Sequence, residues 1–164
     1  MLKALRLLLP LLVLAGAGPA LAFQTAEELN RFYRDFAAGS PDAVTWERLA
    51  EFDLSVVSKG PGMTEFTQSY PAALQAFDGR KVALLGFMFP LEGGETHAHF
   101  LLSAYPPGCP FCLPAGPREL VEVTCDKPIA YTKEAVLLEG TFVLLRDDPS
   151  GLYYRLNDAR PRPR

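Results

Sequence analysis

The sequence has few of the residues and motifs on which recognisable active sites depend. Its 164 residues include three cysteines, two histidines and one tryptophan. No glycine-rich phosphate loop is present, and Ser103 lacks the Gly-x-Ser-x-Gly context of a strained nucleophile elbow. A basic excess is also missing, because 16 Lys and Arg stand against 19 Asp and Glu. Nucleic acid requires a basic face, so the sequence argues against such a partner and against serine nucleophilic catalysis.

The first 22 residues have the pattern of an export signal. Lys3 and Arg6 precede the apolar run LLLPLLVLAGAG, which is too short to span a bilayer. Ala20-Leu21-Ala22 supplies a small-x-small cleavage site. We therefore expect cleavage after Ala22, which leaves a mature chain with a net charge of −5 in the periplasm or outside the cell. No later stretch is long and apolar enough to predict a transmembrane helix.

The N-terminal part of the mature chain is predicted to be helical and the rest to be β. Thr25 and Glu28 form a capping box that opens a helix to about Ala38. A short helix around Trp46 is expected, with the indole in the core. Residues 57–71 are expected to form a loop around Gly-Pro-Gly, and one or two helical turns follow Pro71. A period of two then predicts strands at residues 80–90, 97–105, 119–125, 135–148 and 152–158.

These segments predict a mainly β protein with an N-terminal helix (α+β). Five strands of this kind can close into a small barrel that resembles the oligonucleotide/oligosaccharide-binding fold. Gly140 marks a bulge or bend in the fourth strand. We expect residues 1–22 to be the signal peptide, 23–78 a helical segment and loop packed on the barrel, 79–158 the barrel, and 159–164 a disordered tail.

The stretch YPPGCPFCLP contains Cys109 and Cys112, two residues apart. Such a pair can be a redox dithiol, part of a metal site or a small disulfide. A glutaredoxin-type dithiol needs a helix directly after the cysteines, where the dipole lowers the thiol pKa. Pro114, Gly116 and Pro117 exclude that helix. The metal site and the disulfide both remain open.

The metal interpretation needs further ligands. Thiolates with imidazoles favour zinc or copper. His97 and His99, two residues apart, are expected to point the same way in an extended segment. However, roughly 25 Å of strand separates them from the Cys109 loop, whereas Cys125 can lie nearer to them. The spacing therefore favours a Cys109/Cys112 site separate from a histidine surface site.

Several stretches resemble a family of exported bacterial proteins, domain of unknown function 3299. They are TWERL near Trp46, LQAFDGRKVALLGFMFPLE from Leu74, FLLSAYPPGC and LVEV. The family pattern is Gly-x-Cys-x-His followed by a proline-rich run, and here Cys109 matches its cysteine. Cys112 falls one residue beyond the expected histidine. This departure keeps a soft ligand but removes an acid/base group, so it favours metal binding over Cys–His catalysis and also permits a disulfide. The resemblance suggests a link to transporters implicated in metal handling.

The sequence therefore predicts an exported, non-enzymatic protein that binds zinc or copper through Cys109 and Cys112. Cys125, His97 and His99 are the further candidate ligands. The protein would serve metal trafficking or act with a membrane transporter or an exported protein partner. The alternative is an accessory or interaction module in which a Cys109–Cys112 disulfide pins the loop. A thiol oxidoreductase on an unusual scaffold is the third hypothesis.

Overall fold

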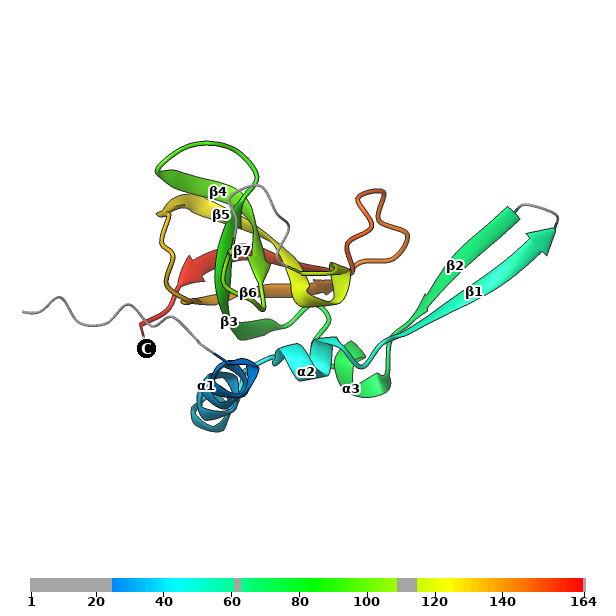
Figure 1. The fold of residues 1–164 in the computed structure, drawn as a ribbon, viewed down its shortest axis with the longest axis horizontal. Coiled ribbons are helices and arrows are strands. Elements are labelled where there is room, and N and C mark those ends of the chain that lie inside the picture. Colours follow the sequence, from blue (N-terminus) through cyan, green and yellow to red (C-terminus); the bar gives the residue numbers. More distant parts are fainter. Residues whose placement is uncertain (1–24, 61–62, 109–114, 164) are drawn as a thin grey trace, which may run out of the picture.

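The computed structural model describes residues 25–60, 63–108 and 115–163, without the side chains of 56–59 and 63–67. A five-stranded barrel stands above three short helical segments, and a two-stranded hairpin extends away from it (Figure 1). The elements in chain order are α1 (Ala26–Gly39), α2 (Trp46–Leu49), β1 (Asp53–Gly60), β2 (Met63–Ser69), α3 (Ala72–Gln75), β3 (Lys81–Pro90), β4 (Thr96–Ser103), the 3-10 helix η1 (Pro117–Glu119), β5 (Leu120–Ala130), β6 (Val136–Leu144) and β7 (Tyr154–Pro161).

The barrel confirms the predicted fold class. Its strand order is β3-β4-β5-β7-β6, closed by pairing of β6 with β3. All neighbours are antiparallel except β5 and β7, which run parallel. A closed five-stranded barrel with one parallel pair resembles the oligonucleotide/oligosaccharide-binding fold. Closure removes the free sheet edges that an open sheet of five strands would leave.

The helical segment packs on the barrel through specific hydrogen bonds as well as apolar contact. The Thr25 side chain caps α1 by accepting from the backbone N–H of Glu28 at 3.2 Å, as the capping motif predicts. The Tyr33 hydroxyl donates to the carbonyl of Ala104 at 2.7 Å, and the Trp46 indole donates to the carbonyl of Leu85 at 2.8 Å. Both side chains are buried in the core, so the single tryptophan has a packing role.

Two boundary predictions are wrong. The segment 57–71, predicted to be a loop, lies mostly in the hairpin of β1 and β2, whose ladder runs from Asp53↔Ser69 to Gly60↔Met63. Gly-Pro-Gly separates two strands there, which a local breaker signal does not distinguish from a longer loop. The tail predicted to be disordered instead extends β7 to Pro161, and Ala159 is buried. Arg162 then pairs with Asp42 at 2.7 Å, while Arg164 lies outside the described residues.

The register is irregular at Gly140, as expected, but the extra residue lies on the partner strand β7 and not on β6. The β6–β7 register shifts between Glu139↔Arg160 and Thr141↔Asn157, so β7 contains one extra residue there. A Cβ on Gly140 would lie 2.7 Å from the carbonyl oxygen of Asn157 and 2.8 Å from Leu156 Cγ. Only glycine permits this close approach of the two backbones. Among the described residues, no helix is both long and apolar enough to span a membrane.

Candidate functional site

The structure places only one of the three cysteines. Cys109 and Cys112 lie outside the described residues, so neither their metal site nor their disulfide is tested. Cys125 lies on β5, is partly buried and has no disulfide partner among the described residues. Burial, with a smaller contribution from the charge of Asp126, raises the pKa of the Cys125 thiol to about 11. At neutral pH this thiol is therefore protonated, which makes it a weak nucleophile.

The two histidines do not point the same way, which corrects the sequence prediction. His97 pairs with Ile129 and His99 pairs with Thr124, so the β4–β5 register shifts between them. His97 is buried and its ring lies edge-on to Tyr131, with 6.3 Å between ring centroids. Neither ring nitrogen of His97 has a hydrogen-bond partner among the described residues. The His99 side chain, in contrast, is half exposed on the outer face of the barrel.

The predicted accessory ligands do not form one metal centre. Cys125 does lie near the histidines in the β4–β5 ladder, because it follows Thr124, the partner of His99. Nevertheless, no group of three His, Cys, Asp or Glu side chains within the described ranges could hold a metal ion. The metal interpretation therefore rests on Cys109 and Cys112, where it remains a prediction.

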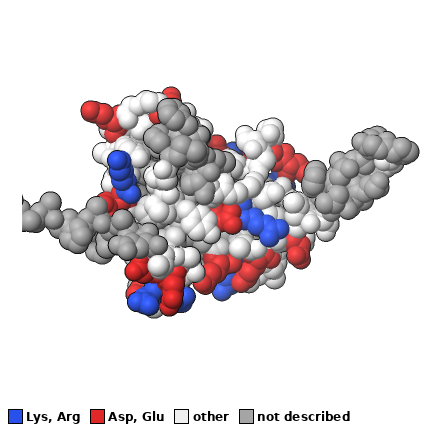
Figure 2. Space-filling view, viewed as in Figure 1, with Lys and Arg blue, Asp and Glu red and all other residues white. Residues whose placement is uncertain are grey.

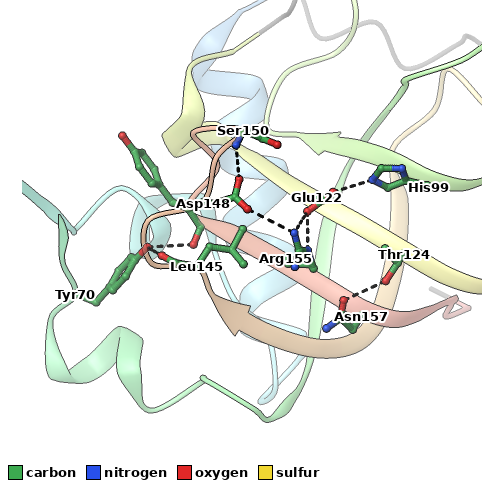
Figure 3. Close-up of polar contacts among 10 residues, drawn as sticks. Tyr70, His99, Glu122, Thr124, Leu145, Asp148, Ser150, Arg155 and Asn157 are labelled. Carbon is green, nitrogen blue, oxygen red and sulfur yellow. Dashed lines mark hydrogen bonds and ion pairs between the residues drawn. The ribbon is translucent and has the colours of Figure 1, made fainter. Parts of the chain in front are cut away.

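A row of polar side chains, of which the sequence pointed only to His99, crosses β4, β5 and β7 (Figure 3). We call it the polar row. Arg155 Nε on β7 donates to Glu122 Oε2 at 2.6 Å, and Arg155 Nη2 forms an ion pair with the same oxygen at 2.6 Å. His99 Nε2 lies 2.8 Å from Glu122 Oε1, which requires the ring proton on Nε2 because a carboxylate only accepts. The row is His99, Glu122, Thr124, Asp148, Arg155 and Asn157.

The loop between β6 and β7 supplies one end of this row. Asp148 Oδ1 lies 3.7 Å from Arg155 Nη2, and Asp148 Oδ2 accepts from the backbone N–H of Ser150 at 3.0 Å. Toward the other end, Thr124 donates to Asn157 Oδ1 at 3.1 Å. The row therefore consists of two groups joined by hydrogen bonds and ion pairs, His99–Glu122–Arg155–Asp148 and Thr124–Asn157, which lie side by side on the strands.

Glu122 is the centre of the polar row. Burial acts to raise the pKa of its carboxyl group, but the hydrogen bonds from His99 and Arg155 and the charge of Arg155 outweigh burial. The pKa of Glu122 therefore lies below its ordinary value of 4.5. A carboxylate held ionised beside an arginine can orient a ligand or a neighbouring side chain, but it is poorly suited to donate a proton at neutral pH.

A groove opens directly beside this row. It has a volume of about 490 Å³ and takes residues from four strands. Thr141, which lines the groove, pairs with Asn157 of the polar row across β6 and β7, so the groove lies next to the row. The groove is lined by Lys81, Asp126, Lys127, Glu139, Gly140, Thr141, Asp158, Ala159, Arg160 and Pro161.

Two irregularities of the barrel form the walls of the groove. On β5, residues 125–128 stand opposite the single residue Ala98, because Thr124 pairs with His99 and Ile129 with His97. On β7, the bulge opposite Gly140 contains Asp158, whose φ of 53° lies in the left-handed region. Bulges of this kind are enriched beside functional sites, where they redirect side chains. Asp tolerates the left-handed conformation better than most residues do.

The comparison with known families covers most of these elements. Residues 45–151 match the family model described as a protein of unknown function, DUF3299. The chain belongs to the DUF3299 family. The match includes the polar-row residues His99, Glu122 and Asp148, whereas the β7 wall of the groove lies beyond it.

One solved structure of a DUF3299 protein is similar to this chain. It is a crystal structure from Pseudomonas aeruginosa PAO1, with 20% sequence identity and a TM-score of 0.48. The similarity covers 74% of this chain and 96% of the other. A search of the curated proteins finds none that matches.

Proposed function

We propose that this DUF3299 chain is an exported, non-catalytic binding module. It takes its ligand in the groove described above, next to the polar row. The observation that carries the proposal is the position of the groove. It lies where two bulges open the barrel wall and adjoins a hydrogen-bonded row of polar side chains.

The size and chemistry of the groove support a small ligand. Pockets that bind small molecules have volumes of about 300–1,000 Å³, and this groove falls within that range. Three basic and three acidic side chains line it. Figure 2 shows acidic and basic side chains interspersed on the face in view, with neither sign covering a broad area. A mixed surface of this kind favours a ligand or partner with both charges over a polyanion.

Chemical-shift mapping of the mature protein tests this proposal. A panel of small fragments is titrated in turn, namely amino acids, simple carboxylates, alkylamines, monosaccharides and short peptides. We expect binding fragments to shift the amide signals of residues 126–127, 139–141 and 158–160. Shifts confined to other surfaces, or no shift with any fragment, would contradict the proposal. A Thr141→Trp variant, which fills the groove, should reduce the shifts without changing the circular dichroism spectrum.

The metal-binding function predicted from Cys109 and Cys112 is a second, separate proposal. Its support is the Cys-x-x-Cys spacing in a proline-rich stretch of the sequence. Two thiolates at this spacing can bind one soft cation. It involves zinc or copper, in metal trafficking or beside a membrane transporter. The remaining ligands would come from elsewhere in this chain or from a partner protein, because no group of three such side chains is found among the described residues.

A further inference from the structure

The unpaired charges of the groove indicate which ligand it takes, if the proposed binding function holds. Arg160 and Glu139 form an ion pair with each other, with 2.7 Å between Nη2 and Oε1. Lys81, Lys127, Asp126 and Asp158 also line the groove, and within the described part of the chain none of them has an ion-pair partner. Two cations and two anions are thus left for a ligand. A ligand with a single charge would be attracted by the two residues of opposite charge and repelled by the two residues of the same charge.

The groove backbone also offers hydrogen-bonding groups. The parallel pairing of β5 with β7 consists of Glu122↔Arg155 and Val123↔Leu156, and goes no further. Residues 125–128 of β5 likewise lie in the break of the β4–β5 register. Among the described residues, this segment therefore has no ladder partner on either side. A strand segment without a ladder partner is a place where an extended ligand can pair by strand addition.

We propose that the groove binds a short peptide with free ends, as a zwitterion. The ligand carboxylate lies toward Lys81 and Lys127, and its ammonium group lies toward Asp126 and Asp158. The backbone of residues 125–128 takes the peptide groups between them. This ligand matches both signs of charge, the unpaired strand segment and the volume of about 490 Å³.

Calorimetric titration of trialanine into the mature protein tests the inference. Trialanine with free ends is compared with the same peptide acetylated at its N-terminus and amidated at its C-terminus. We expect the capped peptide to bind at least tenfold more weakly. Equal affinity for the two peptides would overturn the inference, because the terminal charges would then contribute nothing.

Substitutions in the groove provide the second part of the test. Lys127→Gln and Asp126→Asn should each weaken the binding of free trialanine about tenfold. The matched controls are Lys133→Gln and Glu134→Gln, which are exposed on the neighbouring loop outside the groove and should leave affinity unchanged. Circular dichroism of all four variants checks that the barrel is intact. Unchanged affinity in both groove variants would contradict the proposed ligand orientation and the inference with it.

The two proposals can fail separately. If fragments other than peptides shift the groove amides while trialanine does not bind, the binding module stands and the peptide inference is wrong. If no fragment and no peptide perturbs the groove, both are wrong.

Discussion

Arg155 and Glu122 lie directly opposite each other in the parallel pairing of β5 and β7, joined by a charged hydrogen bond and an ion-pair contact, each of 2.6 Å. The pairing of these strands ends one residue later, at Val123↔Leu156. This pair therefore links β5 to β7 just before their pairing ends and the groove begins. The same carboxylate contacts His99 on the other neighbouring strand, so Glu122 joins three strands on the outer face.

Loss of the Glu122 charge should destabilise the barrel. In Glu122→Gln, we expect a decrease of about 1–2 kcal/mol in the free energy of unfolding at pH 7, because Arg155 loses a charged acceptor. Urea unfolding measures this change. Glu92→Gln, at an exposed position, serves as the control and should unfold like the unmodified chain.

This effect should depend on pH with a defined sign. The pKa of Glu122 is lower in the folded protein than its ordinary value of 4.5. Its contribution to stability is therefore fully present above about pH 4.5 and is lost as the pH falls through the folded pKa. The difference between the unmodified chain and Glu122→Gln should thus decrease in acid. A difference that stays constant from pH 7 to pH 3 would contradict the assigned role of the carboxylate.

Gly140 should not tolerate even a methyl group. A Cβ there would lie 2.7 Å from the Asn157 carbonyl oxygen, so Gly140→Ala must push β6 and β7 apart. We expect a loss of about 1–3 kcal/mol of stability. Gly93→Ala is the matched control because no atom lies within 4 Å of its added Cβ. Thermal unfolding of the two variants checks this, and equal melting temperatures would contradict it.

Tyr154 should contribute through its hydroxyl group as well as its ring. The hydroxyl donates to the carbonyl of Leu49, which ties β7 to the end of α2, and the ring is fully buried against Phe142. Tyr154→Phe leaves that carbonyl without its donor and should cost about 1–3 kcal/mol. Tyr131→Phe, at a more exposed tyrosine, should cost much less. Chemical denaturation of both variants compares the two losses.

Metal analysis tests the cysteine proposal. Protein taken from the exported compartment should contain about one zinc or copper ion, and Cys109→Ser or Cys112→Ser should lose it. Cys125→Ser should keep the metal, because burial raises the pKa of the Cys125 thiol to about 11 and the thiolate is the form that binds metal. Absence of metal under reducing conditions, together with an intact 109–112 disulfide by mass spectrometry, would favour the structural alternative instead.

The export prediction can be checked on the same sample. N-terminal sequencing should begin at Phe23, since cleavage is expected after Ala22. An intact chain from Met1, recovered from the cytoplasm alone, would contradict it.

Much of the fold could be predicted from local patterns. The capping residue Thr25 correctly predicted α1, and the alternation along residues 80–90 correctly predicted β3. Gly140 marked the bulge because a glycine inside a strand usually indicates a close backbone approach. The β1–β2 hairpin was missed because its only local signal, Gly-Pro-Gly, is equally typical of a loop.

The candidate site was much less predictable. His97 and His99 were expected to share a face, but the β4–β5 register shift between them buries one and exposes the other. The period of two along β5 puts Glu122 and Thr124 on one side of the strand. It could not show that Arg155 lies opposite Glu122, because no local pattern encodes which strand becomes the neighbour.

The sequence by itself determined the β-rich class, the capped N-terminal helix and the strands of the barrel. These follow from hydrophobic periodicity and residue conformational preferences, which act over a few residues. The tertiary structure alone decided that Asp126 and Asp158 line one groove and that Glu122 joins His99 to Arg155. Barrel closure sets these relationships, because it fixes the register of distant strands and the places where bulges must interrupt it.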